Sequence, residues 1–264
     1  MEVTIIIRDA IQNKTPISFS KYGDGEFFCA TSCEGRNCDN DNYTEKKKNG
    51  LLDSFKYMVQ QTDNAYVGMW TWSDGQHPIF WQGLVDSTPV KWADYHTLIL
   101  NNENVEEKVK LYKEIKKSSM KKIIICNELL IKAKILFDID HVIHVPFNNW
   151  FDTQFDSLLN QIKEIIEGAD EQFIVMTSAG MGAKILICEL CKLFPNNIYL
   201  DFGSALDKIC TKRVSRGWEP SYDELMRRLS EGEVIPENWN DPVYDYIYPE
   251  ARWKLGVHLP YTEL

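Results

Sequence analysis

The sequence predicts an α/β fold of the Rossmann-like type, in which a mainly parallel sheet carries helices on both faces. Short apolar runs alternate along the chain with segments of helical periodicity, and this order favours parallel strands joined by helices. The 264 residues, 44% of them hydrophobic, are enough to bury one sizeable core. Glycine-rich and polar segments follow several of the apolar runs, where open parallel sheets bind their ligands.

The elements of the first hundred residues follow from this alternation. We expect a helix at residues 3–12, a strand at 17–22, and further strands at 65–69 and 97–100. A second helix is indicated because five apolar residues fall on one helical face: Leu51, Leu52, Phe55, Met58 and Val59.

The second half of the chain continues the alternation. Residues 105–117 predict a helix whose many Lys and Glu side chains form a solvated face. The remaining elements are expected as strands at 122–126, 142–145, 173–177 and 198–201, with helices at 152–166 and 182–193.

The segment Gly23-Asp24-Gly25-Glu26 follows the first predicted strand and carries the strongest functional signal. On an extended backbone, two carboxylates separated by one glycine can face the same side and bind a divalent metal such as Mg²⁺ or Mn²⁺. The glycines would let a diphosphate approach the main chain closely. The alternative is a polar β-turn, for which Gly-Asp-Gly is common chemistry.

Four segments of the chain together resemble one known family. Residues 19–26 (Phe-Ser-Lys-Tyr-Gly-Asp-Gly-Glu) resemble the Arg-Tyr/Phe-Gly-Asp-Gly-Glu opening of the GT-D glycosyltransferases, a family once catalogued as a domain of unknown function. Residues 145–151 resemble its Pro-x-x-Asn-Ala-Phe segment, 178–186 its Leu-Gly-Pro-Thr-Ala-x-Val-Leu segment, and 200–204 its Asp-x-Gly-Ser or Asp-x-Gly-His segment. The motifs are short, but they occur in the same order from about Ile17 to Asp207.

The chain departs from the family pattern at three places. Lys21 stands where the family often has Arg, which keeps the charge but loses the bidentate fork. Trp150 replaces a small Ala and would fill space near the expected pocket, while Met181-Gly182 replaces Pro-Thr. Both carboxylates of the first motif remain.

The resemblance implies a metal-dependent glycosyltransferase that moves a hexosyl or pentosyl group from a nucleotide-diphosphate sugar, most simply a UDP-sugar, to a saccharide or glycoconjugate acceptor. Asp24 and Glu26 would hold Mn²⁺ or Mg²⁺, directly or through water, and the metal would neutralise charge on the departing diphosphate. The expected donor-binding residues are Lys21, Gly23, Gly25, Asn149, Ser178, Ala179, Gly180, Met181, Gly182 and Lys184. A metal-dependent nucleotide-sugar hydrolase and a non-catalytic nucleotide-binding domain are the alternatives.

The resemblance also suggests a division of the chain. Residues 1–210 would form the nucleotide-sugar-binding catalytic domain, and residues 211–264 a helical or irregular extension packed on the same domain.

The loop from Ser178 to Gly182 joins a predicted strand to a predicted helix and contains two glycines. Backbone N–H groups at a helix N-terminus attract anions, so a nucleotide diphosphate could bind there. A tight connection without a ligand is the alternative. The loop lacks the G-x-G-x-x-G pattern, so a redox dinucleotide is a weak candidate.

Residues 70–81 are dense in aromatic and polar side chains, a mixture that suits a saccharide acceptor. Acceptor contacts are expected from Trp70, Trp72 and Trp81, although core packing would also explain Trp70 and Trp81. The candidates for the base that deprotonates the acceptor are Asp201, Asp74 and His77. Position favours Asp201, which ends a strand, unless it only orders the pocket.

Charge and cysteine content limit the partners and the compartment. A formal net charge of -10 argues against a nucleic-acid partner. No apolar run approaches the roughly 20 residues of a membrane span, and the N-terminus lacks a signal-peptide pattern, so a cytoplasmic protein is expected. Cys29, Cys33 and Cys38 are interpreted as loop cysteines, with a zinc site or an oxidised pair as the alternative. Cys188 and Cys191 are expected to pack inside a helix.

Overall fold

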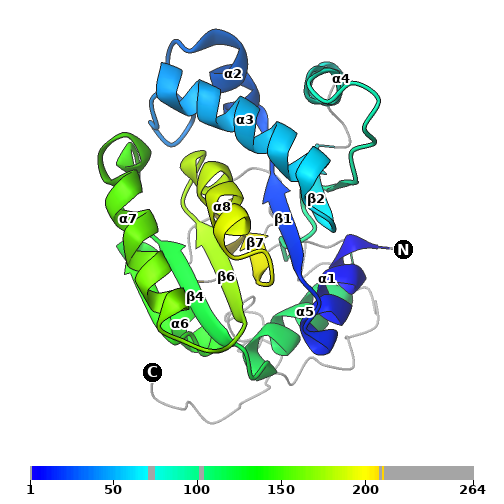
Figure 1. Ribbon diagram of the computed structural model, residues 1–264, viewed down its shortest axis with the longest axis vertical. Coiled ribbons are helices and arrows are strands. Elements are labelled where there is room, and N and C mark those ends of the chain that lie inside the picture. Colours follow the sequence, from blue (N-terminus) through cyan, green and yellow to red (C-terminus); the bar gives the residue numbers. More distant parts are fainter. Residues whose placement is uncertain (1, 71–74, 101–103, 208–209, 211–264) are drawn as a thin grey trace, which may run out of the picture.

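The computed structural model describes residues 2–70, 75–100, 104–207 and 210, and within them a single parallel sheet of seven strands forms the centre of the protein (Figure 1). The strand order is β3-β2-β1-β7-β6-β4-β5. The strands are β1 (Ile17–Lys21), β2 (Ala65–Met69), β3 (Trp92–Asp94), β4 (Lys121–Cys126), β5 (His141–His144), β6 (Phe173–Ser178) and β7 (Ile198–Asp201). The predicted α/β fold with a parallel sheet is therefore confirmed.

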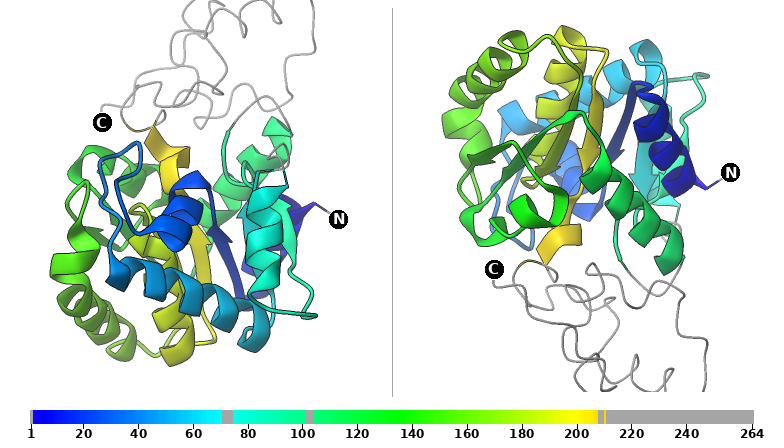
Figure 2. Two further views of the ribbon diagram at one scale, coloured as in Figure 1. Left: turned by 90° about the horizontal axis from the view of Figure 1, so that it is seen from above. Right: turned by 90° about the horizontal axis from the view of Figure 1, so that it is seen from below.

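Helices cover both faces of the sheet. On one face α3 (Glu45–Gln61), α8 (Gly182–Leu193) and α7 (Trp150–Glu167) lie side by side, with α2 (Asp24–Ser32) and α4 (Gln76–Gly83) beside them (Figure 1). The opposite face is covered by α1 (Val3–Asn13), α5 (Val105–Lys117) and α6 (Ala133–Phe137), seen from below in Figure 2. Two short 3-10 helices, η1 (Glu128–Leu130) and η2 (Gly203–Leu206), follow β4 and β7.

The central strands are apolar because both of their faces are buried. In β4, Ile124 packs into the core beneath α1 and α5, whereas Ile123 and Ile125 face the core beneath α7 and α8. Successive side chains of a strand point to opposite faces, so a continuous apolar run serves two cores at once. The helical face predicted at Leu51, Phe55 and Met58 is confirmed, since all three are buried in α3.

One predicted strand is wrong. Residues 95–98 form a turn, and the strand that pairs with β2 is Trp92–Asp94. The hydroxyl of Thr97 donates to the carbonyl of Asp94 at 2.6 Å, which bends the chain away from the sheet. Leu98, Ile99 and Leu100 are nevertheless buried. Their apolar character therefore reflects burial against the core, not strand pairing.

The extended backbone expected at residues 23–26 is also wrong, because Asp24 begins α2 and Glu26 lies in its first turn. The Glu26 carboxylate accepts a hydrogen bond from the backbone N–H of Gly23 at 2.9 Å and so caps the helix that contains it. Acidic residues are favourable in the first turn, where the helix dipole is positive. Besides α2, the alternation also did not predict α4 and α6.

The C-terminal part of the chain and the cysteines were also subjects of expectations. The extension expected at residues 211–264 lies outside the described residues, and the division into two parts stays a prediction. Cys188 and Cys191 are buried free thiols in α8, as expected. The interpretation of Cys29 as a loop cysteine is wrong, because it is a buried free thiol in α2. No helix in the part of the chain that the structure describes is long and apolar enough to span a bilayer.

Helix α8 packs closely on α7 through Gly182. A Cβ at this position would lie 2.9 Å from Cζ2 of Trp150 and 3.0 Å from Cβ of Phe151. We expect Gly182→Ala to lower the free energy of unfolding by about 1–3 kcal/mol, because the rigid ring cannot move aside without cost. Urea denaturation measures this change.

Gly83→Ala is the matched control, because nothing lies within 4 Å of a Cβ at this helical position. It should be neutral or stabilising by up to about 1 kcal/mol. Equal effects of the two substitutions would contradict the close packing of α8 on α7.

Candidate functional site

The carboxyl ends of the parallel strands surround a cavity of about 610 Å³. Residues that follow β1, β4, β5, β6 and β7 contribute to its lining, and the sequence motifs predicted this for the segments after β1, β5, β6 and β7. These residues are Asp24, Gly25 and Glu26 after β1, Asn127 after β4, Pro146 and Phe147 after β5, Ala179, Gly180 and Met181 after β6, and Gly203, Ser204 and Asp207 after β7.

A second part of the lining was not predicted. The loop at residues 33–44, between α2 and α3, contributes Asn37, Cys38, Asp39 and Asp41. Tyr95, which follows β3, also lines the cavity. The density of Asn and Asp between Asn37 and Asn42 was the only available signal, since these residues favour turns and carry polar side chains.

Lys184 lies at the centre of the site, where three strand-end segments meet. Its ammonium is 2.8 Å from Oε1 of Glu26 and 3.0 Å from Oδ2 of Asp201. It also donates to the carbonyl of Gly180 at 3.1 Å. Burial alone would lower the pKa of Lys184, but the carboxylates of Asp201 and Glu26 outweigh burial and raise the pKa above its usual value. Lys184 therefore ties the segments after β1, β6 and β7 together as a permanent cation.

Asp201 is fully buried and every hydrogen bond of its carboxylate is internal. Oδ2 accepts from the backbone N–H of Lys21 at 3.0 Å in addition to its contact with Lys184. Oδ1 accepts from the N–H of Gly203 at 3.1 Å and from the Thr177 hydroxyl at 3.5 Å. Asp201 does not line the cavity. Its role as a base stays a prediction, and this geometry favours the alternative that it orders the pocket.

Lys21 lies behind the cavity, where Gly203 makes room for it. The ammonium donates to the carbonyl of Phe202 at 2.6 Å and lies 4.8 Å from the ring centre of Tyr95. A Cβ on Gly203 would be 2.5 Å from this nitrogen, and the φ of +52° at Gly203 also favours glycine. Burial lowers the pKa of Lys21 to about 8, although Asp201 opposes the change.

The two carboxylates proposed as metal ligands differ in their surroundings. Glu26 uses one oxygen for the N–H of Gly23 and the other for Lys184, whereas Asp24 is exposed and lines the cavity. The described residues contain no group of three or more His, Cys, Asp or Glu arranged for a metal. Mg²⁺ is commonly held through one or two carboxylates together with water and substrate phosphates. The residues present fit that pattern with Asp24 as the direct protein ligand.

The loop between β6 and α8 is held from two sides. The indole N–H of Trp150 donates to the carbonyl of Ala179 at 2.8 Å, and the hydroxyl of Ser178 donates to the carbonyl of Gly203. Gly180 is exposed, with a φ of +64°, at the N-terminus of α8. Ser178, Ala179, Gly180, Met181 and Lys184 all line the cavity, whereas Gly182 lies beneath the ring of Trp150.

The aromatic segment divides between the cavity and the core. Trp70 lines the cavity and stacks on Tyr95 with ring centres 3.7 Å apart, and His77 lines it while stacking on Phe27 at 4.0 Å. Trp81 is fully buried against Tyr22 and Phe55, so in this arrangement no part of it reaches the cavity. Trp72 and Asp74 lie outside the described residues.

The remaining expected donor-binding residues lie behind the lining. Lys21, Gly23 and Asn149 are not part of the cavity wall. Gly23 precedes α2, whose first residues line the cavity, and Asn149 precedes α7.

Comparison with known proteins relates this arrangement to one group of solved structures. No protein-family model and no curated protein matches the chain. Two structures of the domain of unknown function 1792, one of them described as having a distinct glycosyltransferase fold, align with a TM-score of 0.55 at 14% identity over 98% of this chain and 90% of theirs. A structure described as a new glycosyltransferase (DUF1792) from Streptococcus sanguinis aligns with a TM-score of 0.56 at 15% identity, over 92% of this chain and 95% of that one. The chain therefore has the fold of that domain, and the resemblance inferred from the four sequence segments is confirmed for the fold.

The buried amine of Lys21 predicts a pH dependence of stability. Its pKa is about 8 in the folded protein and near 10.5 in the unfolded chain, so between these values the unfolded state binds more protons. The free energy of unfolding should therefore rise with pH through this group, by up to about 1.4 kcal/mol per pH unit. Lys21→Met should remove that contribution.

We would measure the free energy of unfolding of the wild type and of Lys21→Met by urea denaturation at several pH values between about 7 and 10.5. The difference between the two proteins at each pH isolates the contribution of Lys21 from that of other titrating groups. A difference that stays constant over this range would contradict the lowered pKa of Lys21.

Proposed function

We propose that this chain, which has the fold of the domain of unknown function 1792, is a glycosyltransferase that uses a nucleotide-diphosphate sugar, most simply a UDP-sugar, and a saccharide or glycoconjugate acceptor. One observation carries the proposal. A single cavity at the carboxyl edge of the sheet combines an open carboxylate, a helix N-terminus and aromatic rings, namely Asp24, the start of α8, and Trp70 with Tyr95. These groups match the metal-bound diphosphate and the sugar of such a donor and acceptor pair.

The diphosphate would bind at the N-terminus of α8. Backbone N–H groups and the helix dipole favour an anion at this position. The absence of a side chain at Gly180 leaves the backbone accessible from the cavity. Ser178 and Trp150 hold the loop in place before any ligand arrives, which limits the entropy lost on binding.

The charge balance of the site favours a divalent cation. Lys184 is already neutralised by Glu26 and Asp201, so it supplies little net positive charge to a bound diphosphate. Mn²⁺ or Mg²⁺ would supply that charge and stabilise the leaving group. Asp24 would bind it directly, and Glu26 would act through water, since both of its oxygens already have partners.

The acceptor would lie against the aromatic side of the cavity. The stacked pair of Trp70 and Tyr95 offers a flat surface that suits the C–H face of a sugar. Among the base candidates in the described residues, His77 lines the cavity and Asp201 does not. In an inverting transfer, His77 would take the hydroxyl proton as the acceptor oxygen bonds to the anomeric carbon and the bond to the diphosphate breaks.

If Asp24 holds the metal, Asp24→Asn should lose the stabilisation that depends on Mn²⁺. A panel of UDP-glucose, UDP-galactose and UDP-N-acetylglucosamine, each with and without Mn²⁺, is read by thermal shift. The wild type should gain stability with a donor and Mn²⁺, about 2.7 kcal/mol when the ligand is at 100 times its Kd. Asp24→Asn should lose the Mn²⁺-dependent part while its unliganded melting temperature stays unchanged, because Asp24 is exposed.

Asp53→Asn, an exposed carboxylate on α3, is the matched control and should behave as the wild type. A full Mn²⁺ response in Asp24→Asn would exclude Asp24 as the ligand. Release of nucleotide that does not depend on an acceptor would indicate a hydrolase instead of a transferase.

The assignment of the base predicts a contrast between His77→Gln and Asp201→Asn. His77→Gln should lower transfer by roughly 10²–10⁴-fold with unchanged donor affinity. Asp201→Asn should instead lower the free energy of unfolding by about 3–5 kcal/mol, because it leaves Lys184 with one carboxylate fewer in a buried site. A product assay, donor calorimetry and urea denaturation separate these effects. Normal transfer in His77→Gln, with transfer lost in a stable Asp201→Asn, would assign the base to Asp201.

A further inference from the structure

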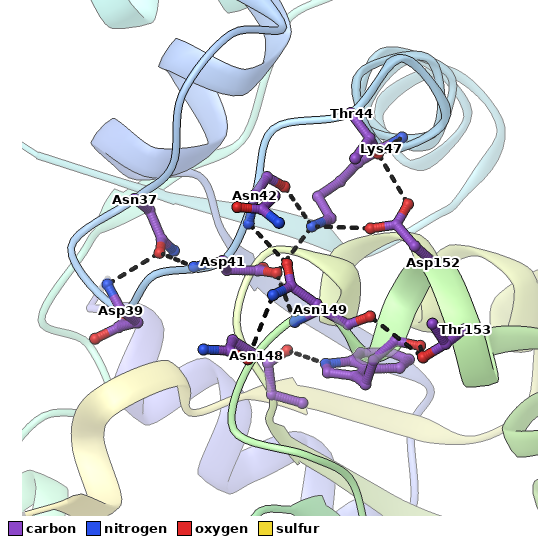
Figure 3. A network of polar contacts seen from close by, with 12 residues as sticks. Asn37, Asp39, Asp41, Asn42, Thr44, Lys47, Asn148, Asn149, Asp152 and Thr153 are labelled. Atoms are coloured by element: carbon purple, nitrogen blue, oxygen red, sulfur yellow. Dashed lines mark hydrogen bonds and ion pairs between the residues drawn. The ribbon is translucent and has the colours of Figure 1, made fainter.

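Asp41 is a nearly buried carboxylate on the wall of the cavity, and only one of its two oxygens has a partner. Oδ1 accepts from the ammonium of Lys47 and from the backbone N–H of Asn149, both at 2.9 Å (Figure 3). Oδ2 accepts no hydrogen bond from any residue that the structure describes. The side chain is 7% exposed, and the residue lines the cavity. A carboxylate in this setting has one hydrogen-bond acceptor left for a ligand.

The partner of Asp41 is fixed in turn. Lys47 is fully buried, and its ammonium also donates to the carbonyl of Asn42 at 2.6 Å. The same nitrogen lies 3.6 Å from Oδ2 of Asp152 (Figure 3). The hydroxyl of Thr44 caps α3 by accepting from the N–H of Lys47 at 3.2 Å, and it donates to Asp152 at 2.9 Å. These contacts hold the Lys47 ammonium in place, and Lys47 in turn fixes the orientation of the Asp41 carboxylate.

Two other loops enclose the same carboxylate. Asn149 has a φ of +58° at the start of α7, and its side-chain oxygen accepts from the N–H of Asn42 at 2.9 Å (Figure 3). From the other side, a Cβ built on Gly180 would lie 3.6 Å from Oδ2 of Asp41. Gly180 carries no such atom, so the free oxygen borders the segment where the diphosphate is proposed to bind.

The chemistry of this oxygen restricts its ligand. A phosphate would be repelled by a carboxylate, so the group that binds must be a hydrogen-bond donor. A metal ion would meet the ammonium of Lys47 at the other oxygen, and the described residues provide no group of three metal ligands. A purely structural carboxylate would use both oxygens internally, as Asp201 does.

We propose that Oδ2 of Asp41 binds a hydroxyl group of the nucleotide sugar, either on the ribose or on the transferred sugar. The inference rests on the proposed function, because it places a ribose or sugar beside the diphosphate at Gly180. Lys47 and Asn149 hold the carboxylate in position before the ligand binds. Asp41 thereby selects donors by the position of one hydroxyl.

Calorimetry with the full chain tests this assignment. The ligands are the tightest-binding nucleotide sugar of the UDP-glucose, UDP-galactose and UDP-N-acetylglucosamine panel and its monodeoxy analogues, each lacking one ribose or sugar hydroxyl. The wild type should bind one analogue about 10- to 100-fold more weakly than the parent, the range expected for a hydrogen bond to a charged group. The affected analogue identifies the ribose or the sugar as the source of the hydroxyl.

Asp41→Asn should bind the parent more weakly by a similar factor and should no longer distinguish the parent from that analogue. Asp156→Asn, an exposed carboxylate on α7, is the matched control and should retain the wild-type discrimination. Circular dichroism checks folding. If Asp41→Asn does not fold, the double variant Asp41→Asn with Lys47→Met replaces it, because that variant leaves no unpaired ammonium at this position.

Three results would overturn the inference. Asp41 would have no role in hydroxyl recognition if Asp41→Asn still distinguished the parent from that analogue. The same would follow if the wild type bound all analogues with equal affinity. Either result would leave the proposed function intact. A loss in Asp41→Asn that occurs only with Mn²⁺ would make Asp41 a metal ligand. Absence of wild-type binding across the whole panel would refute the use of these UDP-sugars as donors, and the inference would fall with it.

Discussion

The buried ammonium of Lys184 is the interaction on which the geometry of the cavity depends. Removing such a charge from water is costly, and the cost is offset only because two carboxylates and a carbonyl surround it. Each of these oxygens comes from the end of a different strand or from the segment that follows it. One side chain thus sets the distances between the loops after β1, β6 and β7. These loops carry most of the residues proposed to bind the donor.

This arrangement separates the acidic residues of the site into two kinds. Glu26 and Asp201 have internal partners for both oxygens and maintain the structure. Asp24 and Asp41 each keep an oxygen open toward the cavity. Only the second kind has an oxygen for which the structure shows no internal partner. Lys184 and Lys47 are each paired with two carboxylates, so neither offers an uncompensated positive charge to an anionic ligand.

Part of this structure could be predicted from the sequence, because the alternation of apolar runs follows directly from the burial of parallel strands. The convergence of the strand-end segments followed from the same pattern. Helix α2 was missed since Gly23 and Gly25 lower helix propensity, while its cap depends on the side chain of Glu26. Trp81 was expected at the acceptor or in the core, and its burial favours the core, because an aromatic residue in the sequence does not distinguish the two. Asp41 and Asn149 are 108 positions apart in the sequence, and no local sequence pattern predicts their contact.

The packing of Trp150 on Gly182 links two positions that lie 32 residues apart in the sequence. A Cβ at residue 182 would lie 2.9 Å from the Trp150 ring, so a large side chain at residue 150 fits here only while residue 182 carries none. The same indole N–H donates to the carbonyl of Ala179. The size of residue 182 therefore also influences how firmly the loop before α8 is held, and the two positions act as one unit.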